Sequence, residues 1–147
     1  MNFSKNKYAV NDQLFNQLAQ LNLPLTEYAI TGSGPMGIRG LRKMHDIDLL
    51  VTMSLWEQLA KKYPETVENG LHKLKLSKTI EAVHPASFTH QDASVPSVLE
   101  QITSSEEIHG LSFVRLPITL FFKQRSKREK DRRDAILITQ WLEDNPQ

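Results

Sequence analysis

Two aspartates separated by one residue, Asp46 and Asp48, open an apolar segment that runs to Val51. On a β-strand, residues two apart point to the same face, so these two carboxylates would lie side by side. Their charges repel each other unless a cation lies between them, and carboxylate oxygens are the ligands that hard cations such as Mg²⁺ prefer. The pair therefore predicts a site for a hard metal ion at the start of a strand.

A glycine-rich turn precedes the aspartates, because a short apolar segment leads into Gly32, Ser33 and Gly34. The backbone N–H groups of such a turn, together with a serine hydroxyl, are suited to binding phosphate. Arg39 and Arg42 lie between this turn and the acids, where they either face a triphosphate or are solvated at the surface. The turn and the acids together predict a site that combines a metal ion with a phosphate group.

The same glycines also match the pattern G-x-G-x-x-G of dinucleotide-binding folds, over residues 32–37. In those folds the acid that binds the ribose lies at the far end of the next strand, after a crossover helix. Here the acids come before their strand, and the segment from Gly37 to Asp46 is too short for such a helix. The order of the residues favours metal and phosphate binding over dinucleotide binding.

The composition is that of an ordinary globular protein, with 147 residues, 39% hydrophobic and 24% charged residues, and a net charge of +1. The chain has no cysteine, and its five histidines do not form a closely spaced pair, which argues against a zinc site. No apolar segment approaches the length of a membrane span, and the N-terminus lacks a signal-like apolar stretch. We expect one cytoplasmic domain over residues 1–147, with residues 1–10 loosely ordered, and no membrane partner.

The secondary structure that must position these groups is mixed. Strands are predicted over residues 28–31, 46–52, 74–76 and 79–83, with an edge strand over 111–114. Helices are predicted after Asn11 or Asp12, after Ser54, over residues 97–102 and 104–108, from Pro117, and at the C-terminus. Strands and helices that do not strictly alternate predict an α+β domain, with a mixed sheet of about four or five strands flanked by helices and a helical C-terminus.

The combination of Gly32, Ser33, Asp46 and Asp48 resembles the signature of the nucleotidyltransferase superfamily. This superfamily includes the β-type DNA polymerases, the poly(A) polymerases and the antibiotic adenylyltransferases. Its signature is an apolar strand that ends in Gly-Ser or Gly-Gly, followed after a short loop by Asp-x-Asp in a second apolar strand. The resemblance covers about a sixth of the chain, and it implies the DNA polymerase β-like fold.

The resemblance also implies a third carboxylate on a later strand, for which Glu81 is the best match and Asp92, in a loop-like segment, is the reserve. Asp46, Asp48 and Glu81 would then hold two magnesium ions about 4 Å apart. Ser33 and the neighbouring N–H groups would bind the β- and γ-phosphates of a nucleoside triphosphate. The alternative for Glu81 is a solvent-facing position on an edge strand.

A basic segment over residues 122–134 resembles the C-terminal region of small bacterial nucleotidyltransferase-like proteins, including toxins of the abortive-infection type. On that resemblance Lys123 and Lys130 are candidate phosphate contacts, and Asp131 and Asp134 are either helix caps or site residues. The alternative is a solvated turn between two helices.

The function implied is magnesium-dependent transfer of a nucleoside monophosphate from a nucleoside triphosphate to a hydroxyl or phosphate acceptor. A second possibility is a non-catalytic nucleotide-binding regulator, or a toxin–antitoxin component, with the same fold. The chain is short for an enzyme that must also bind an acceptor, so a protein partner or a second copy in a homodimer would provide that surface.

Overall fold

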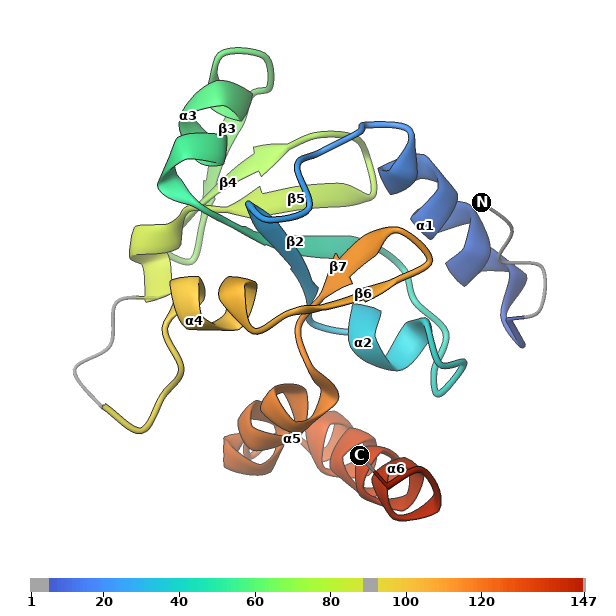
Figure 1. The fold of residues 1–147 in the computed structure, drawn as a ribbon. Coiled ribbons are helices and arrows are strands. Elements are labelled where there is room, and N and C mark those ends of the chain that lie inside the picture. The colour runs from blue at the N-terminus through green and yellow to red at the C-terminus, as the bar shows by residue number, and fades with distance from the viewer. Residues whose placement is uncertain (1–5, 89–92, 147) are drawn as a thin grey trace.

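The computed structural model describes residues 6–88 and 93–146, and it is built around one mixed sheet (Figure 1). The strands are hydrogen-bonded in the order β3-β4-β5-β2-β1-β7-β6, with β2 in the centre. β2 pairs antiparallel with β1 and parallel with β5, whereas β1 pairs parallel with β7. The seven strands are β1 (Tyr28–Thr31), β2 (Ile47–Val51), β3 (Glu65–Glu68), β4 (Leu71–Lys75), β5 (Ile80–Val83), β6 (Glu106–Ile108) and β7 (Leu111–Phe113).

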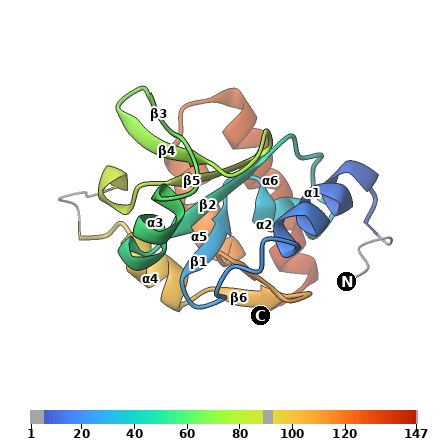
Figure 2. The same cartoon turned by 90° about the horizontal axis from the view of Figure 1, so that it is seen from above.

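Helices cover both faces of this sheet because its central strands are apolar on both sides. Leu49 faces a core that includes α1 and α3, whereas Leu50 faces a smaller cluster with residues of α4. The helices are α1 (Ala9–Ala19), α2 (Gly34–Gly37), α3 (Met53–Ala60), α4 (Val98–Thr103), α5 (Leu116–Arg125) and α6 (Glu129–Asp144), with a 3-10 turn at Pro85–Phe88. The last two helices pack against each other, at the bottom of Figure 1 and behind the strands in Figure 2.

A buried asparagine fixes the loop that joins the glycine-rich turn to the aspartates. Asn11 donates hydrogen bonds from Nδ2 to the carbonyl oxygens of Gly37 (3.1 Å) and Arg42 (2.9 Å). Its Oδ1 accepts a bond from the N–H of Met44 at 2.8 Å. We predicted Asn11 as a possible helix cap, but α1 begins at Ala9 and Asn11 lies inside it. The side chain thus positions the site from within the first helix.

The predicted α+β class agrees with the structure, but the predicted strand count was wrong. The sheet has seven strands rather than four or five, and this architecture does not by itself establish the nucleotidyltransferase fold. The segment 104–108, predicted as a helix, contains strand β6, which pairs with β7. That pairing also makes β7 an interior strand rather than an edge strand.

β3 was missed because it lies at an edge of the sheet and its side chains are mostly exposed, so it lacks an apolar pattern. The predicted N-terminus of α3 was also wrong. Its N-cap is Thr52, whose side chain accepts a hydrogen bond from the N–H of Leu55, and not Ser54.

Of the segment expected to be loose, residues 1–5 lie outside the described part of the chain. Asn6 donates a hydrogen bond to the carbonyl oxygen of Gly37 at 2.8 Å. Within the described residues, none of the helices combines the length and the apolar character that crossing a bilayer requires.

Candidate metal and nucleotide site

The candidate site is organised around a row of side chains that crosses four neighbouring strands. Thr31 of β1 is opposite Asp48 of β2, and Asp48 is opposite Glu81 of β5. Glu81 is in turn opposite Lys75 of β4. Residues directly opposite each other share one face of a sheet, so the row brings two of the three predicted metal-binding carboxylates together.

Asp48 lies in an electrostatically unfavourable position. Burial raises the pKa of its carboxyl group to about 6; the negative charges of Asp46 and Glu81 add to the rise, and Lys73 opposes it. Asp46 is exposed, directly before β2. The charged form of Asp48 is therefore disfavoured in this environment, and a cation close to the carboxylate would stabilise it.

Glu81 already has positively charged neighbours. Lys73 Nζ lies 3.4 Å from its Oε2, and Lys75 Nζ lies 3.4 Å from its Oε1. Burial lowers the pKa of Lys73, but the carboxylates of Glu81, Glu68 and Asp48 raise it, and the net shift is upward. The two lysines therefore supply, beside Glu81, part of the positive charge that a metal ion would provide.

Among the described residues, no three carboxylate or imidazole groups are gathered closely enough to form a complete metal-binding cluster. The chemistry of the row nevertheless fits a hard cation, because its possible ligands are carboxylate oxygens. Asp46, Asp48 and Glu81 are the residues that would hold such an ion. The reserve candidate, Asp92, lies outside the described residues.

The glycine-rich turn approaches Asp48 closely. Gly32 has a φ of +64°, and a Cβ placed on it would lie 3.2 Å from Asp48 Oδ2. Ser33 precedes α2, and its side chain makes no capping hydrogen bond to that helix. Gly34 has a packing role, because a Cβ there would overlap Cγ2 of Ile30. The turn thus brings the backbone at Gly32 beside the carboxylate, and the serine that follows this glycine does not use its side chain as a helix cap.

Arg39 is engaged away from this turn. Its guanidinium group forms an ion pair with Glu106 of β6 and donates a hydrogen bond to the carbonyl oxygen of Pro35 at 2.8 Å. It also lies over the ring of Trp141 of α6, 4.8 Å from the centroid. These contacts give Arg39 a role in joining α6 and β6 to α2.

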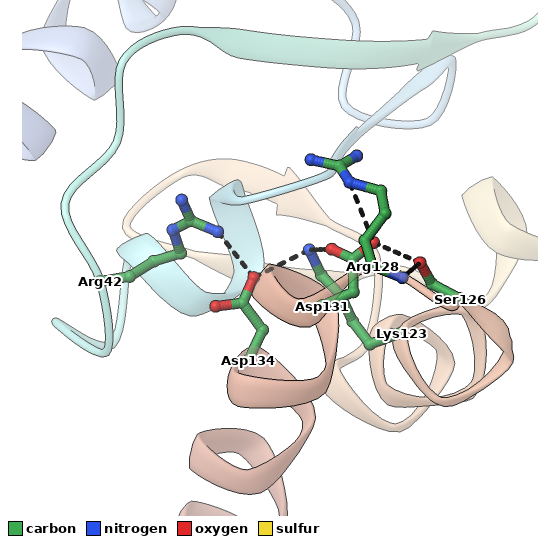
Figure 3. Close-up of polar contacts among 6 residues, drawn as sticks. All are labelled: Arg42, Lys123, Ser126, Arg128, Asp131 and Asp134. Atoms are coloured by element: carbon green, nitrogen blue, oxygen red, sulfur yellow. Dashed lines mark hydrogen bonds and ion pairs between the residues drawn. The ribbon is translucent and has the colours of Figure 1, made fainter.

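Arg42 and Lys123 belong to a buried ionic network where α5 and α6 meet (Figure 3). Oδ2 of Asp134 accepts a hydrogen bond from Arg42 Nη1 at 2.6 Å and forms an ion pair with Lys123 Nζ at 3.0 Å. Lys123 Nζ also donates to Oδ1 of Asp131 at 3.0 Å, and Ser126 Oγ donates to Oδ2 of Asp131 at 2.6 Å. The network fastens α6 to both α5 and the loop that precedes the aspartates.

This network defines what Lys123 can offer a ligand. The ammonium group of Lys123 is ion-paired with two carboxylates, those of Asp131 and Asp134, each at 3.0 Å, so most of its charge is balanced within the network. Burial raises the pKa of Asp131, but hydrogen bonds from Ser126 and Lys123 and the charges of Lys123 and Arg128 lower it below its usual value. Lys130, the other predicted phosphate contact, is exposed on α6 and does not join this group.

A cavity of about 300 Å³ lies beside the row. Thr31 and Gly32 line it from the sheet, and Lys123 and Asp131 line it from the ionic network. The cavity therefore connects two groups of predicted site residues that are far apart in the sequence.

The lysines of β4 and the residues that α4 and α5 contribute to the cavity were not predicted from the sequence. The sequence Lys73-Leu-Lys75 carried a usable signal, since residues two apart on a strand share a face. The cavity residues Gln101 and Thr119 carried none, because isolated polar residues in short helices are common.

No model of a known protein family matches the sequence, and no curated protein matches it.

Proposed function

We propose that this protein is a magnesium-dependent nucleotidyltransferase, which transfers a nucleoside monophosphate from a nucleoside triphosphate to a hydroxyl or phosphate acceptor. One observation carries the proposal: Asp48 of β2 lies opposite Glu81 of β5, and the Asp48 carboxylate faces Gly32. Carboxylates and a glycine-rich turn thereby meet at one end of the central strands, as the resemblance to the superfamily implies.

The residues have distinct roles in this proposal. Asp46, Asp48 and Glu81 hold the metal, and bound magnesium supplies positive charge to the reacting phosphate and its leaving group. The backbone at Gly32 and the hydroxyl of Ser33 bind the outer phosphates. The acceptor oxygen forms a bond to the α-phosphorus, the bond to the bridging oxygen breaks, and pyrophosphate leaves while the acceptor's proton passes to solvent.

A second function, nucleotide binding without transfer, is favoured by one observation. Both oxygens of Glu81 lie 3.4 Å from a lysine ammonium group, so this carboxylate is balanced without a metal ion. A regulator or toxin–antitoxin component that binds nucleotide through the same turn has no need for a third metal ligand. The two functions therefore differ in whether Glu81 leaves its lysines to bind a cation.

The test uses nucleoside triphosphates labelled at the α-phosphate, incubated with Mg²⁺, the protein and a cell extract as the source of acceptors. We expect a labelled product with the native protein and none above background with Asp48→Asn. Glu57→Gln, an exposed carboxylate on α3, is the matched control and should retain the product. Equal labelling by the native protein and Asp48→Asn would refute transfer, and nucleotide binding without any product would favour the second function.

A further inference from the structure

The cavity beside the carboxylate row is lined by both apolar and polar side chains. Leu50, Val114 and Phe122 contribute apolar surface, while Gln101 and Thr119 contribute polar groups. Its volume of about 300 Å³ is at the lower end of the range of small-molecule sites. Such a lining suits a ligand that is largely flat and apolar but carries hydrogen-bonding groups at its edge.

One polar group in the cavity lacks a partner. Thr119 of α5 is only 5% exposed, and its Oγ1 has no hydrogen-bond partner among the described residues. A buried hydroxyl without a partner destabilises the protein, and an unsatisfied polar group of this kind calls for a specific explanation. Because Thr119 lines the cavity, a ligand that forms a hydrogen bond to Thr119 Oγ1 would explain the unpaired hydroxyl.

The position of the cavity links it to the carboxylates. Leu50 lies two residues after Asp48, on the same face of β2 and about 7 Å along the strand. Gly32, which faces the Asp48 carboxylate, also lines the cavity. Lys123, whose ammonium group is ion-paired with Asp131 and Asp134, lines it as well. A ligand in the cavity can therefore extend an anionic group toward both the glycine-rich turn and a cation.

We propose that this cavity binds the base and ribose of the nucleoside triphosphate, with the base against Phe122 and its polar edge hydrogen-bonded to Thr119 Oγ1. The phosphates leave the cavity past Gly32 toward Asp48. The inference rests on the proposed function, since it names where that function's substrate lies. An aromatic wall and a single hydroxyl suit a heterocyclic base, because a ring packs on its face and hydrogen-bonds at its edge.

The test measures the binding of free nucleosides, which need neither metal nor phosphate contacts. Saturation-transfer NMR and calorimetry with adenosine, guanosine, cytidine and uridine, in EDTA, should detect at least one ligand. Thr119→Val keeps the shape of the side chain but removes its hydroxyl, and we expect it to weaken nucleoside binding about fivefold to tenfold. Its thermal midpoint should equal or exceed that of the native protein, because the unpaired hydroxyl is gone.

Two further variants complete the experiment. Phe122→Leu removes the ring from a side chain that is 38% exposed, so folding should be preserved while nucleoside binding falls. Thr139→Val, at an exposed position on α6, is the matched control and should bind like the native protein. The inference is overturned if no nucleoside binds, or if Thr119→Val and Phe122→Leu bind as well as the native protein, as they would if the cavity held the acceptor.

Failure of this inference can be distinguished from failure of the proposed function. Asp48→Asn should bind nucleosides normally, because Asp48 does not line the cavity. Nucleoside binding that depends on Thr119, without transfer of any label, would support the cavity and refute the enzyme. Label transfer that depends on Asp48, without effects of Thr119→Val on nucleoside binding, would support the enzyme and refute the cavity.

Discussion

Gly32 faces the carboxylate of Asp48 so closely that a Cβ on the glycine would lie 3.2 Å from Oδ2. This approach joins the end of β1 to the second aspartate, across the antiparallel pair in which Thr31 is opposite Asp48. The turn and the acid are therefore one structural unit, although α2 and a loop separate them in the sequence.

Gly32→Ala should impair nucleotide binding as well as folding. The positive φ at residue 32 strains any side chain, which should lower the free energy of unfolding by about 1–2 kcal/mol. The added Cβ also meets the Asp48 carboxylate and should displace it, so binding of the triphosphate should fall. Urea denaturation and calorimetric titration measure the two effects.

Gly70→Ala is the matched control for this change. Gly70 has a φ of +79°, but nothing lies within 4 Å of the position that a Cβ would take there, so the variant should lose a similar amount of stability and no binding. Native-like nucleotide binding by Gly32→Ala would show that the close approach has no role in the site.

Asp48 should make the stability of the protein depend on pH. Its carboxyl pKa is about 6 in the folded protein and 3.8 as the ordinary value, so between these values the folded state binds more protons than the unfolded state. Stability contributed by this group is therefore present at low pH and is lost as the pH rises, by about 3 kcal/mol in total. Urea denaturation in EDTA from pH 4 to pH 7 measures the loss.

Asp48→Asn provides the reference for this titration, because it cannot ionise. The variant should gain stability relative to the native protein as the pH rises, with the gain levelling off above about pH 6. A constant difference between the two proteins across this range would show that the pKa of Asp48 is not raised.

Lys73→Met should strengthen the binding of a divalent cation. Lys73 lies 3.4 Å from Glu81 and lowers the pKa of Asp48, so its charge opposes a metal ion at the same carboxylates. Removing that charge should tighten Mn²⁺ binding, followed by electron paramagnetic resonance, by about tenfold. Lys78→Met, an exposed lysine just before β5, should bind Mn²⁺ as the native protein does. Weaker binding in Lys73→Met would contradict this competition.

Asp134→Ala should strongly destabilise the C-terminal helices. Asp134 is 5% exposed and is the shared partner of Arg42 and Lys123. Removing it leaves two cations poorly balanced in a buried position, which should cost about 3 kcal/mol. Glu129→Ala removes an exposed partner of Arg133 on the same helix and should cost about 0.5 kcal/mol or less. Equal losses in urea denaturation would show that the network does not fasten α6.

The sequence allowed the central elements to be predicted, because each has a strong local signal. The apolar segments of β1 and β2, the glycine-rich turn and the two aspartates were all recognisable from residue type and spacing. The edge strands had weaker signals. β3 and β6 each lead into a two-residue hairpin loop, Asn69-Gly70 and His109-Gly110, in which both residues have positive φ. Asn-Gly in particular is a strong hairpin signal, and Asn69-Gly70 is sufficient to predict β3 as the partner of β4.

The partners of the basic residues could not be predicted, since they depend on how distant segments pack. Arg39 and Arg42 lie close to the glycine-rich turn in sequence, which suggested phosphate contacts. In the fold, β6 and α6 return to this region and supply Glu106 and Asp134 as their partners. The residues adjacent to either arginine in the sequence do not indicate these carboxylates. A prediction from the charge of the arginines alone therefore overestimated how many basic groups are available to bind a ligand.

The two outer strands of the sheet have a consequence for association between copies. β3 carries Glu65 and Glu68, and β6 carries Glu106 and Glu107. A second chain that extended the sheet by pairing like edges would bring these carboxylates against each other, and charged edge strands oppose such growth. Growth of the sheet from either outer strand into an extended assembly of copies is therefore disfavoured.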